Sequence, residues 1–384
     1  MRKAFKYRLW TNKNQERELG IMLETHRHLY NACLAQKKDA YELEKKSIKY
    51  TEQSVWFKAE RTTNDYFARI NFSSAQATMR RLDKSFQAFF RRIKTGAKPG
   101  YPRFKGRDFF DSVEFPSHGD GIRLTANRLR VQHVGIIRVC LHRPVEGTIK
   151  TLSLKREAGK WYLIVSCDLG DVVIAPSVNP SIGIDVGLNS FLVTSNGEHV
   201  ANPRFLKAEL PELRRRQRSL SRKKKLGSNG RKAIKKVQKL HAKVKNVRRE
   251  FHFKTSNELI RRYGMIAMES LNIKGMVKNR RLARSISDVA WASFQSILRH
   301  KAESAGVTVI GVNPKNTSQI CSSCGQIVEK SLSVRIHNCP HCGLVLNRDH
   351  NAARNILARG VQAWTKPVGL NLEVAPSVPG SRLL

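Results

Sequence analysis

Two pairs of cysteines near the C-terminal end place the tightest constraint on how this chain folds. The pairs are Cys321 with Cys324 and Cys339 with Cys342, each in the pattern C-x-x-C. Residues 325–338 separate them, and these fourteen residues fall just below the window of about 15–20 that is typical of zinc ribbons. Four thiolates complete the tetrahedral shell of one Zn²⁺ and leave no position for water, so we expect the ion to be structural.

The remaining cysteines and histidines leave some choices open. His337 and His341 are alternative zinc ligands within the same segment. Cys33, Cys140 and Cys167 are scattered among apolar residues, where a free thiol behaves as a small buried hydrophobe. This distribution of seven cysteines favours a reducing compartment over a disulfide-bonded protein.

The net charge predicts a polyanionic partner. Lysine and arginine total 71 against 30 acidic residues, which gives a formal charge of +41. No uninterrupted apolar run approaches the roughly 18 residues of a membrane span, and the first ten residues alternate like a strand. We therefore expect a cytoplasmic protein with no membrane partner, although the charge by itself does not distinguish DNA from RNA as the partner.

The N-terminal half combines helical and alternating patterns. Residues 14–92 have helical periodicity, with an apolar stripe that predicts core positions at Leu82, Phe86, Phe89, Phe90 and Ile93. Short alternating runs between residues 111 and 173 predict antiparallel strands. We expect these strands to form a small β-barrel that the strand at residues 4–10 completes, with the helices as an insertion.

Three acids in the C-terminal half are candidates for a second metal site. Asp185 and Glu269 each end a short apolar run of strand character, and Asp349 begins a helix after the second cysteine pair. Mg²⁺ prefers such oxygen ligands, and two ions held by carboxylates assist phosphodiester hydrolysis. Each acid also has a structural interpretation: Asp185 could merely end a strand, Glu269 could cap a turn and Asp349 could be a helix N-cap.

Basic residues on predicted helices and on a Gly/Pro-rich loop are candidates for binding nucleic acid, although a solvated charged face is the alternative. They are Arg80, Arg81, Arg91, Arg92, Lys98, Arg103, Lys105, Arg214, Arg215, Arg216, Lys243 and Arg248.

Four sequence blocks, in this order, resemble the TnpB (OrfB) family of transposon-encoded RNA-guided endonucleases, which is related to type V CRISPR effectors. The blocks are IDVGLN at 184–189, MESLN at 268–272, the two cysteine pairs and NRDHNAARN at 347–355. FFRRIKTG at 89–96 with GYPRFK at 100–105, and HAKVKNVRR at 241–249, extend the resemblance outside the nuclease.

The resemblance implies an α+β multidomain fold with bounds that can be placed on this sequence. The expected parts are a wedge-like β-barrel at 1–12 and 98–178, an inserted helical recognition domain at 13–97, a RuvC-like α/β (RNase H-like) nuclease domain at 181–318 and 344–360, an inserted zinc ribbon at 319–343 that binds the target nucleic acid, and a disordered tail at 361–384.

The resemblance also implies an activity. The protein would be the RNA-guided DNA endonuclease of an insertion-sequence transposon, cutting double-stranded DNA that matches its guide RNA beside a short flanking motif. Asp185, Glu269 and Asp349 match the family's catalytic acids and would hold two Mg²⁺ ions. Ser73, Ser74 and Gln76 are candidates for reading the flanking motif.

Two alternatives remain open, a nuclease-inactive RNA-guided DNA-binding regulator and a transposase accessory protein. The sequence leaves the oligomeric state unknown, with one protein molecule per RNA favoured.

Overall fold

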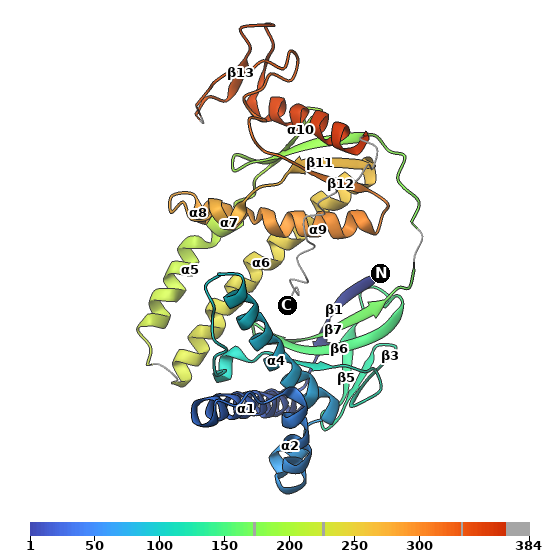
Figure 1. Ribbon diagram of the computed structural model, residues 1–384, viewed down its shortest axis with the longest axis vertical. Helices are drawn as coiled ribbons and strands as arrows, with labels where there is room; N and C mark the ends of the chain where they lie inside the picture. The colour runs from blue at the N-terminus through green and yellow to red at the C-terminus, as the bar shows by residue number, and fades with distance from the viewer. Residues whose placement is uncertain (172–173, 225–226, 332, 366–384) are drawn as a thin grey trace. The chain divides into compact units, whose positions relative to one another are not determined.

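The computed structural model describes residues 1–171, 174–224, 227–331 and 333–365, and the chain forms two compact units, 1–172 and 173–384 (Figure 1). The functional domain bounds given above stay predictions. Within the described ranges, every helix is too short or too polar to cross a membrane.

The first unit contains a seven-stranded antiparallel sheet. In chain order its strands are β1 (Arg2–Trp10), β2 (Ser112–Phe115), β3 (Ile122–Thr125), β4 (Arg128–Val131), β5 (Gly135–Cys140), β6 (Thr148–Glu157) and β7 (Lys160–Asp168). They are ordered β2-β6-β7-β1-β5-β4-β3 in the sheet.

β1 completes this sheet, as expected, because it joins the strand groups β2-β6-β7 and β5-β4-β3. β1 pairs with both β5 and β7, so it lies in the middle of the sheet. No strand pairing joins the edge strands β2 and β3 among the described residues. Phe5, Tyr7 and Leu9 are buried, as the alternation of β1 predicts.

Four helices stand in the chain between β1 and β2. They are α1 (Lys13–Glu44), α2 (Tyr50–Thr63), α3 (Asp65–Ala68) and α4 (Phe72–Lys94). Asn12 caps α1 in a capping box with Gln15, and the side chain of Asn71 accepts the N–H of Ser74 at the start of α4. Helix and sheet residues share one hydrophobic core.

The apolar stripe of α4 is only partly core. Leu82 is fully buried, whereas Phe90 is 52% and Ile93 50% exposed, so the core prediction is wrong at these two positions. Phe89 packs edge to face on Tyr101, with ring centroids 5.4 Å apart. The helical periodicity identified one face of α4. Part of that face is covered by Tyr101, a residue of the following loop, and not by the hydrophobic core.

The second unit is a five-stranded mixed sheet with helices on both faces. Its strands are β8 (Ser181–Val186), β9 (Ser190–Thr194), β10 (His199–Ala201), β11 (Met265–Glu269) and β12 (Thr308–Val312), in the order β10-β9-β8-β11-β12. Its helices are α5 (Phe205–Ser221), α6 (Ser228–Arg262), α7 (Ile273–Met276), α8 (Ala283–Val289), α9 (Trp291–Glu303) and α10 (Arg348–Thr365).

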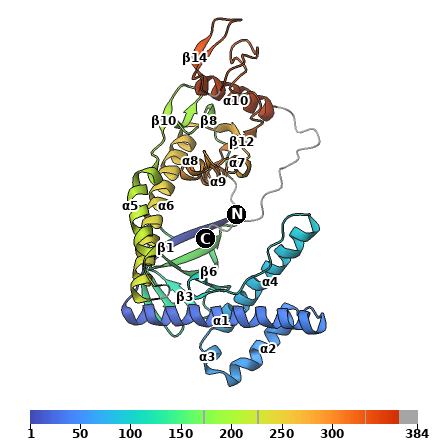
Figure 2. The ribbon, with the colours of Figure 1, turned by 90° about the vertical axis from the view of Figure 1, so that its left-hand side faces the viewer.

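The side chains of β11 show how the layers are built. Ile266 and Met268 share a core with α6 and α9, while Met265 and Ala267 pack with Ile356 of α10. α9 and α10 lie on opposite faces of the sheet (Figure 1). Burial of both faces explains why the sequence of β11 is continuously apolar. α5 and α6 form a long helical hairpin (Figure 2).

Two segments follow β12. The hairpin of β13 (Ile336–Asn338) and β14 (Val345–Asn347) precedes α10 and carries the second cysteine pair at its turn. α10 continues to Thr365, so the expectation of a disordered tail is wrong for residues 361–365. Residues 366–384 lie outside the described ranges.

Two glycines allow α10 to approach the sheet closely. A Cβ atom on Gly183 of β8 would lie 2.2 Å from the carbonyl oxygen of Ala353, and one on Gly360 would lie 2.3 Å from the Cβ of Ala267. Both separations are shorter than any van der Waals contact, so α10 can rest on β8 and β11 only because these positions lack side chains.

Gly183→Ala is therefore expected to lower the free energy of unfolding by about 3 kcal/mol, the upper end of the usual overpacking range, because backbone atoms of α10 must move. Gly20→Ala on α1 is the control. A Cβ atom on Gly20 would meet open space among the described residues, and alanine should stabilise that helix by roughly 0.5–1 kcal/mol. Chemical denaturation measures both values. Equal stability of Gly183→Ala and the wild type would contradict the close approach.

Candidate metal centre and nucleic-acid interface

The fold brings two of the predicted acids to the same end of neighbouring strands. β8 and β11 run parallel with Ile184 opposite Met268, so Asp185 and Glu269 are the next pair in register. Ile184 and Met268 face the core shared with α6 and α9. Because side chains alternate along a strand, Asp185 and Glu269 face the opposite side, which α10 covers.

Asp349 lies in the first turn of α10, on that same side of the sheet. Its backbone N–H and that of His350 donate to the side chain of Asn347, at 2.9 and 3.3 Å. Asn347 is therefore the helix cap, and the interpretation of Asp349 as an N-cap is wrong. The carboxylate of Asp349 makes no capping bond; it lies 3.9 Å from the guanidinium group of Arg335, in a position that the helix dipole favours.

The electrostatics show that Glu269 and Asp349 act on Asp185. Burial, followed by the negative charges of Glu269 and Asp349, raises the pKa of Asp185 well above its usual value, and Arg348 opposes this. Burial also raises the pKa of Glu269, against the opposing effects of the Thr317 hydroxyl and Arg359. A divalent cation would relieve both penalties, since it would neutralise the crowded carboxylates.

The acids do not converge as ligands of a single ion would. Among the described residues, only the four cysteines bring at least three ligand atoms within 4.8 Å of one another.

In Mg²⁺-free buffer, Asp185→Asn is expected to raise the melting temperature near pH 7.5. Folding raises the pKa of Asp185, so the wild type keeps its full stability below the unfolded pKa of about 3.9 and loses part of it as the pH rises toward the folded pKa. Asparagine carries no charge, so the difference in melting temperature should grow from pH 4 to pH 7.5.

The pH dependence of stability is expected to have the opposite sign for Asp168→Asn, because the backbone N–H of Gly170 helps to lower the pKa of Asp168 in the folded state. A difference between Asp185→Asn and the wild type that does not change with pH would contradict the burial of an ionisable carboxyl at position 185.

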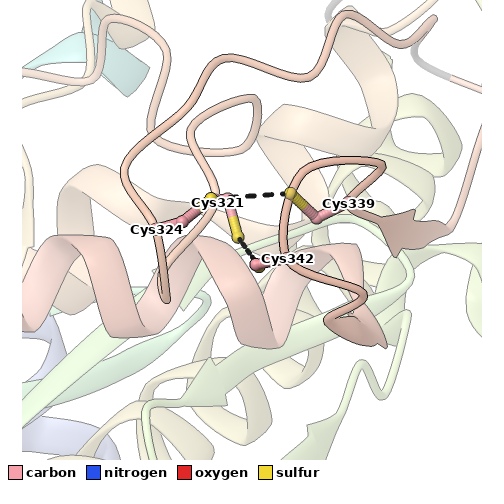
Figure 3. Close-up of side chains that lie close together, drawn as sticks. All are labelled: Cys321, Cys324, Cys339 and Cys342. Carbon is pink, nitrogen blue, oxygen red and sulfur yellow. Dashed lines mark hydrogen bonds between the residues drawn. The ribbon is translucent and has the colours of Figure 1, made fainter.

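The four cysteines form a compact group of sulfur atoms (Figure 3). Cys321 Sγ lies 3.6 Å from Cys342 Sγ, and Cys324 Sγ lies 3.6 Å from Cys339 Sγ. A Zn–S bond of about 2.3 Å places tetrahedral sulfur atoms about 3.8 Å apart, so the group fits a zinc site. Neither His337 nor His341 belongs to it.

The backbone around the cysteines favours thiolate. Burial opposes ionisation of Cys321, yet the N–H groups of Cys324 and Ser323 lower its pKa to about 5. Cys324 receives the N–H of Gln326, which lowers its pKa, but burial and the neighbouring thiols raise it to about 12. A bound divalent cation would stabilise the thiolates together, so that the neighbouring sulfur atoms would no longer raise the pKa of Cys324.

The sequence interpretation missed three polar residues that connect the turn of the first cysteine pair with the acids: Thr317, Asn351 and Asn355. The spacing of the asparagines on α10, at i and i+4, was the available signal, because it places both on one helix face.

Several of the predicted nucleic-acid-binding residues are engaged within the protein. Arg81 donates to the carbonyl of Ser112 at 3.2 Å, and Arg248 pairs with Asp288 at 2.8 Å. Arg216 pairs with Glu212, and Lys243 pairs with Glu209. Those cations hold helices and strands together, so the prediction of a nucleic-acid role is weaker for them.

The other predicted cations are more accessible. Arg80, Arg91, Arg92, Lys98, Arg103, Arg214 and Arg215 are exposed, while Lys105 is half-buried with its ammonium group over the ring of Tyr30. Arg215 also pairs with Glu212.

The candidates for reading a flanking motif are not on a free polar surface. Ser74 is buried and donates to the carbonyl of Asn71 at 2.8 Å. Ser73 donates to the side chain of Asn71, and Gln76 donates to Ser54. The structure argues against Ser74 and leaves the other two as predictions.

Comparison with known proteins gives matches along most of the chain. Family profiles match at residues 165–280 (OrfB, probable transposase), 291–356 (Cas12f1-like, TNB domain) and 1–46 (helix-turn-helix domain). In the structure, residues 1–46 contain a strand and one continuous helix rather than two helices joined by a turn.

Three relatives illustrate the similarity. The chain is 31% identical over 381 residues to a putative RNA-guided DNA endonuclease of Streptomyces pristinaespiralis, covering 94% of this chain and 90% of that protein. It is 29% identical over 380 residues to the putative RNA-guided DNA endonuclease InsQ of Escherichia coli K12, covering 93% and 92%. It is 28% identical over 334 residues to a CRISPR-associated endodeoxyribonuclease, Cas12f1, of Sulfoacidibacillus thermotolerans, covering 75% and 77%.

Proposed function

Because the chain belongs to the TnpB (OrfB) family of transposon-encoded RNA-guided DNA endonucleases, we propose that Asp185, Glu269 and Asp349 form the centre with which it cleaves DNA. The observation that supports this proposal is the placement of three acids from β8, β11 and α10 on one side of the sheet, where the charges of Glu269 and Asp349 act on the buried Asp185. The strand order, with β8 central and β9 antiparallel, is typical of an RNase H-like nuclease domain.

The carboxylates are suited to Mg²⁺, which takes hard oxygen ligands. When bound, two such ions would activate the attacking water and stabilise the leaving 3′ oxygen of the phosphodiester. The protein's own contribution is to hold the three acids in place: the paired strands fix Asp185 and Glu269, and the Asn347 cap fixes the first turn that carries Asp349.

The four-cysteine group has a different role in this proposal. Its sulfur ligands would hold one Zn²⁺ with no open position, so the zinc orders the chain between β12 and α10 and takes no part in hydrolysis. The partners are a guide RNA and double-stranded DNA. The guide RNA selects the target by base pairing, and the protein contacts the DNA mainly at the sugar–phosphate backbone.

The end of α4 and the loop after it are proposed to bind nucleic acid. Arg91, Arg92, Lys98 and Arg103 are exposed there beside the half-exposed rings of Phe90 and Tyr101. Cations contact phosphates, and exposed aromatic rings stack on unpaired bases.

Replacing Arg91 and Arg92 together by glutamine is expected to weaken RNA binding and to reduce the salt dependence of affinity by a slope of about 1.4–1.8, or roughly 0.7–0.9 per lost phosphate contact. Lys38→Gln is the control, since Lys38 is exposed on α1 but paired with Glu42. Binding measured between 50 mM and 200 mM salt tests this. An unchanged slope would identify a solvated face.

The function itself is tested by sequencing the RNA that co-purifies with the full chain. A plasmid that carries the matching segment next to randomised flanking sequence should be cut in Mg²⁺, and the cut molecules should share one flanking motif. A matched plasmid that stays intact beside every flanking sequence would contradict RNA-guided cleavage. No observation favours the regulator or the transposase accessory protein.

A further inference from the structure

The segment between β12 and the first cysteine pair touches both proposed metal sites. Thr317 lies in this segment with only 4% of its surface exposed. Its hydroxyl lies within hydrogen-bond distance of Glu269 Oε1 and of the carbonyl oxygen of Pro314, and it donates to the carboxylate. No other hydrogen-bond donor to the Glu269 carboxylate occurs in the described part of the chain.

Two asparagines of α10 hold this segment against the helix. Asn355 donates to the carbonyl oxygens of Thr317 and Ile320, at 2.8 and 2.7 Å. Asn351 donates to the same Ile320 carbonyl at 2.7 Å and accepts the N–H of Ser322 at 2.9 Å. Both side chains are buried, so water does not compete for these bonds.

These hydrogen bonds and the polypeptide chain connect the first cysteine pair with the carboxylate of Glu269. Ser322 is the residue after Cys321, so the turn that carries the first cysteine pair is bonded to Asn351. The same helix carries Asp349 in its first turn, and Thr317 at the other end of the segment contacts Glu269. The first cysteine pair and two of the acids are thus joined through one helix.

We propose that Thr317 is a positioning residue for Glu269, held in place by Asn351 and Asn355, so that an ordered four-cysteine group presents Glu269 to the catalytic ions. This inference rests on the proposed function of the acids. Glu269 has several rotatable bonds, and Thr317 restrains one of its two oxygens, leaving Oε2 for a cation. Mg²⁺ demands near-ideal geometry at about 2.0–2.1 Å, so an unrestrained carboxylate binds it less well.

Thr317→Val removes the hydroxyl and keeps the branched shape, whereas Thr317→Ser keeps the hydroxyl. Loss of such a supporting hydrogen bond typically weakens metal binding by about 10–100-fold. Mn²⁺ binding by the full chain freed of RNA, followed by electron paramagnetic resonance, should therefore weaken at least about tenfold in Thr317→Val. Thr317→Ser should stay within about threefold of the wild type, and the Mg²⁺ concentration for half-maximal cleavage should shift in parallel.

Thr25→Val is the matched control, because Thr25 is a buried threonine of the first unit whose hydroxyl donates to the carbonyl of Ile21 at 3.1 Å. It should leave Mn²⁺ binding unchanged. Unchanged Mn²⁺ affinity in Thr317→Val would overturn the proposal, as would equal weakening in the valine and serine variants, which would indicate a packing role. If Glu269→Gln itself binds Mn²⁺ and cleaves like the wild type, the proposed function of the acids fails instead.

Discussion

Asp185→Ala is expected to lower the rate of target cleavage by at least about 10³-fold while leaving the affinity for guide RNA unchanged. The variant removes the central carboxylate of the proposed centre, which neighbours both Glu269 and Asp349 electrostatically. Metal ions contribute several kcal/mol to the transition state, and each 1.36 kcal/mol corresponds to about tenfold in rate. Single-turnover cleavage of a matched DNA with pre-bound RNA measures the effect.

Glu258→Gln is the control for this experiment. Glu258 is an exposed acid of the same unit, on α6, where it pairs with Arg261. Its replacement should change the cleavage rate less than about twofold, as is usual for surface substitutions. If Asp185→Ala cleaves as fast as Glu258→Gln, the acids identified by their strand ends are not the catalytic ones.

Cys324→Ser is expected to have the second-largest effect, acting through the fold. A serine hydroxyl replaces one of four thiolates, so zinc content should fall well below one ion per chain. Structural zinc supplies about 10–16 kcal/mol of apparent binding free energy in small zinc domains, and its loss should disorder the hairpin and lower the melting temperature. Cleavage should fall by about 10–100-fold, because the segment that carries Thr317 is no longer held.

Cys140→Ser is the matched control, because Cys140 is an exposed free thiol on β5 in the other unit. Elemental analysis and calorimetry of both variants separate the outcomes. Full zinc content and an unchanged melting temperature in Cys324→Ser would show that the four sulfur atoms do not form a structural site.

The local parts of the candidate site were predictable from the sequence. Cys321 and Cys324 lie in one short turn, so their spacing alone indicates a shared ligand site. Asp185 and Glu269 each follow an apolar run, which is typical of the end of a buried strand. Their side-by-side placement needed only the parallel pairing of β8 and β11, and parallel strands expose their ends at one edge.

The parts that depend on distant partners were not predictable. Arg248 looked like a nucleic-acid contact because its own helix is so basic, but its partner Asp288 lies forty positions away on another helix. Thr317 and Asn355 have ordinary sequence surroundings, and only the packing of α10 brings them together. Likewise, the period of α4 could not show that Phe90 lies beyond the core.

The most direct test of the two-ion centre is the position of Mn²⁺ in the complex of the full chain with its co-purifying RNA and a matched DNA. Anomalous scattering from crystals should show two Mn²⁺ peaks about 3.5–4 Å apart, with Asp185 contacting both and with Glu269 and Asp349 as the other protein ligands. Asp185→Asn crystals should lose at least one peak. Mn²⁺ bound elsewhere, with none at Asp185, would contradict the account.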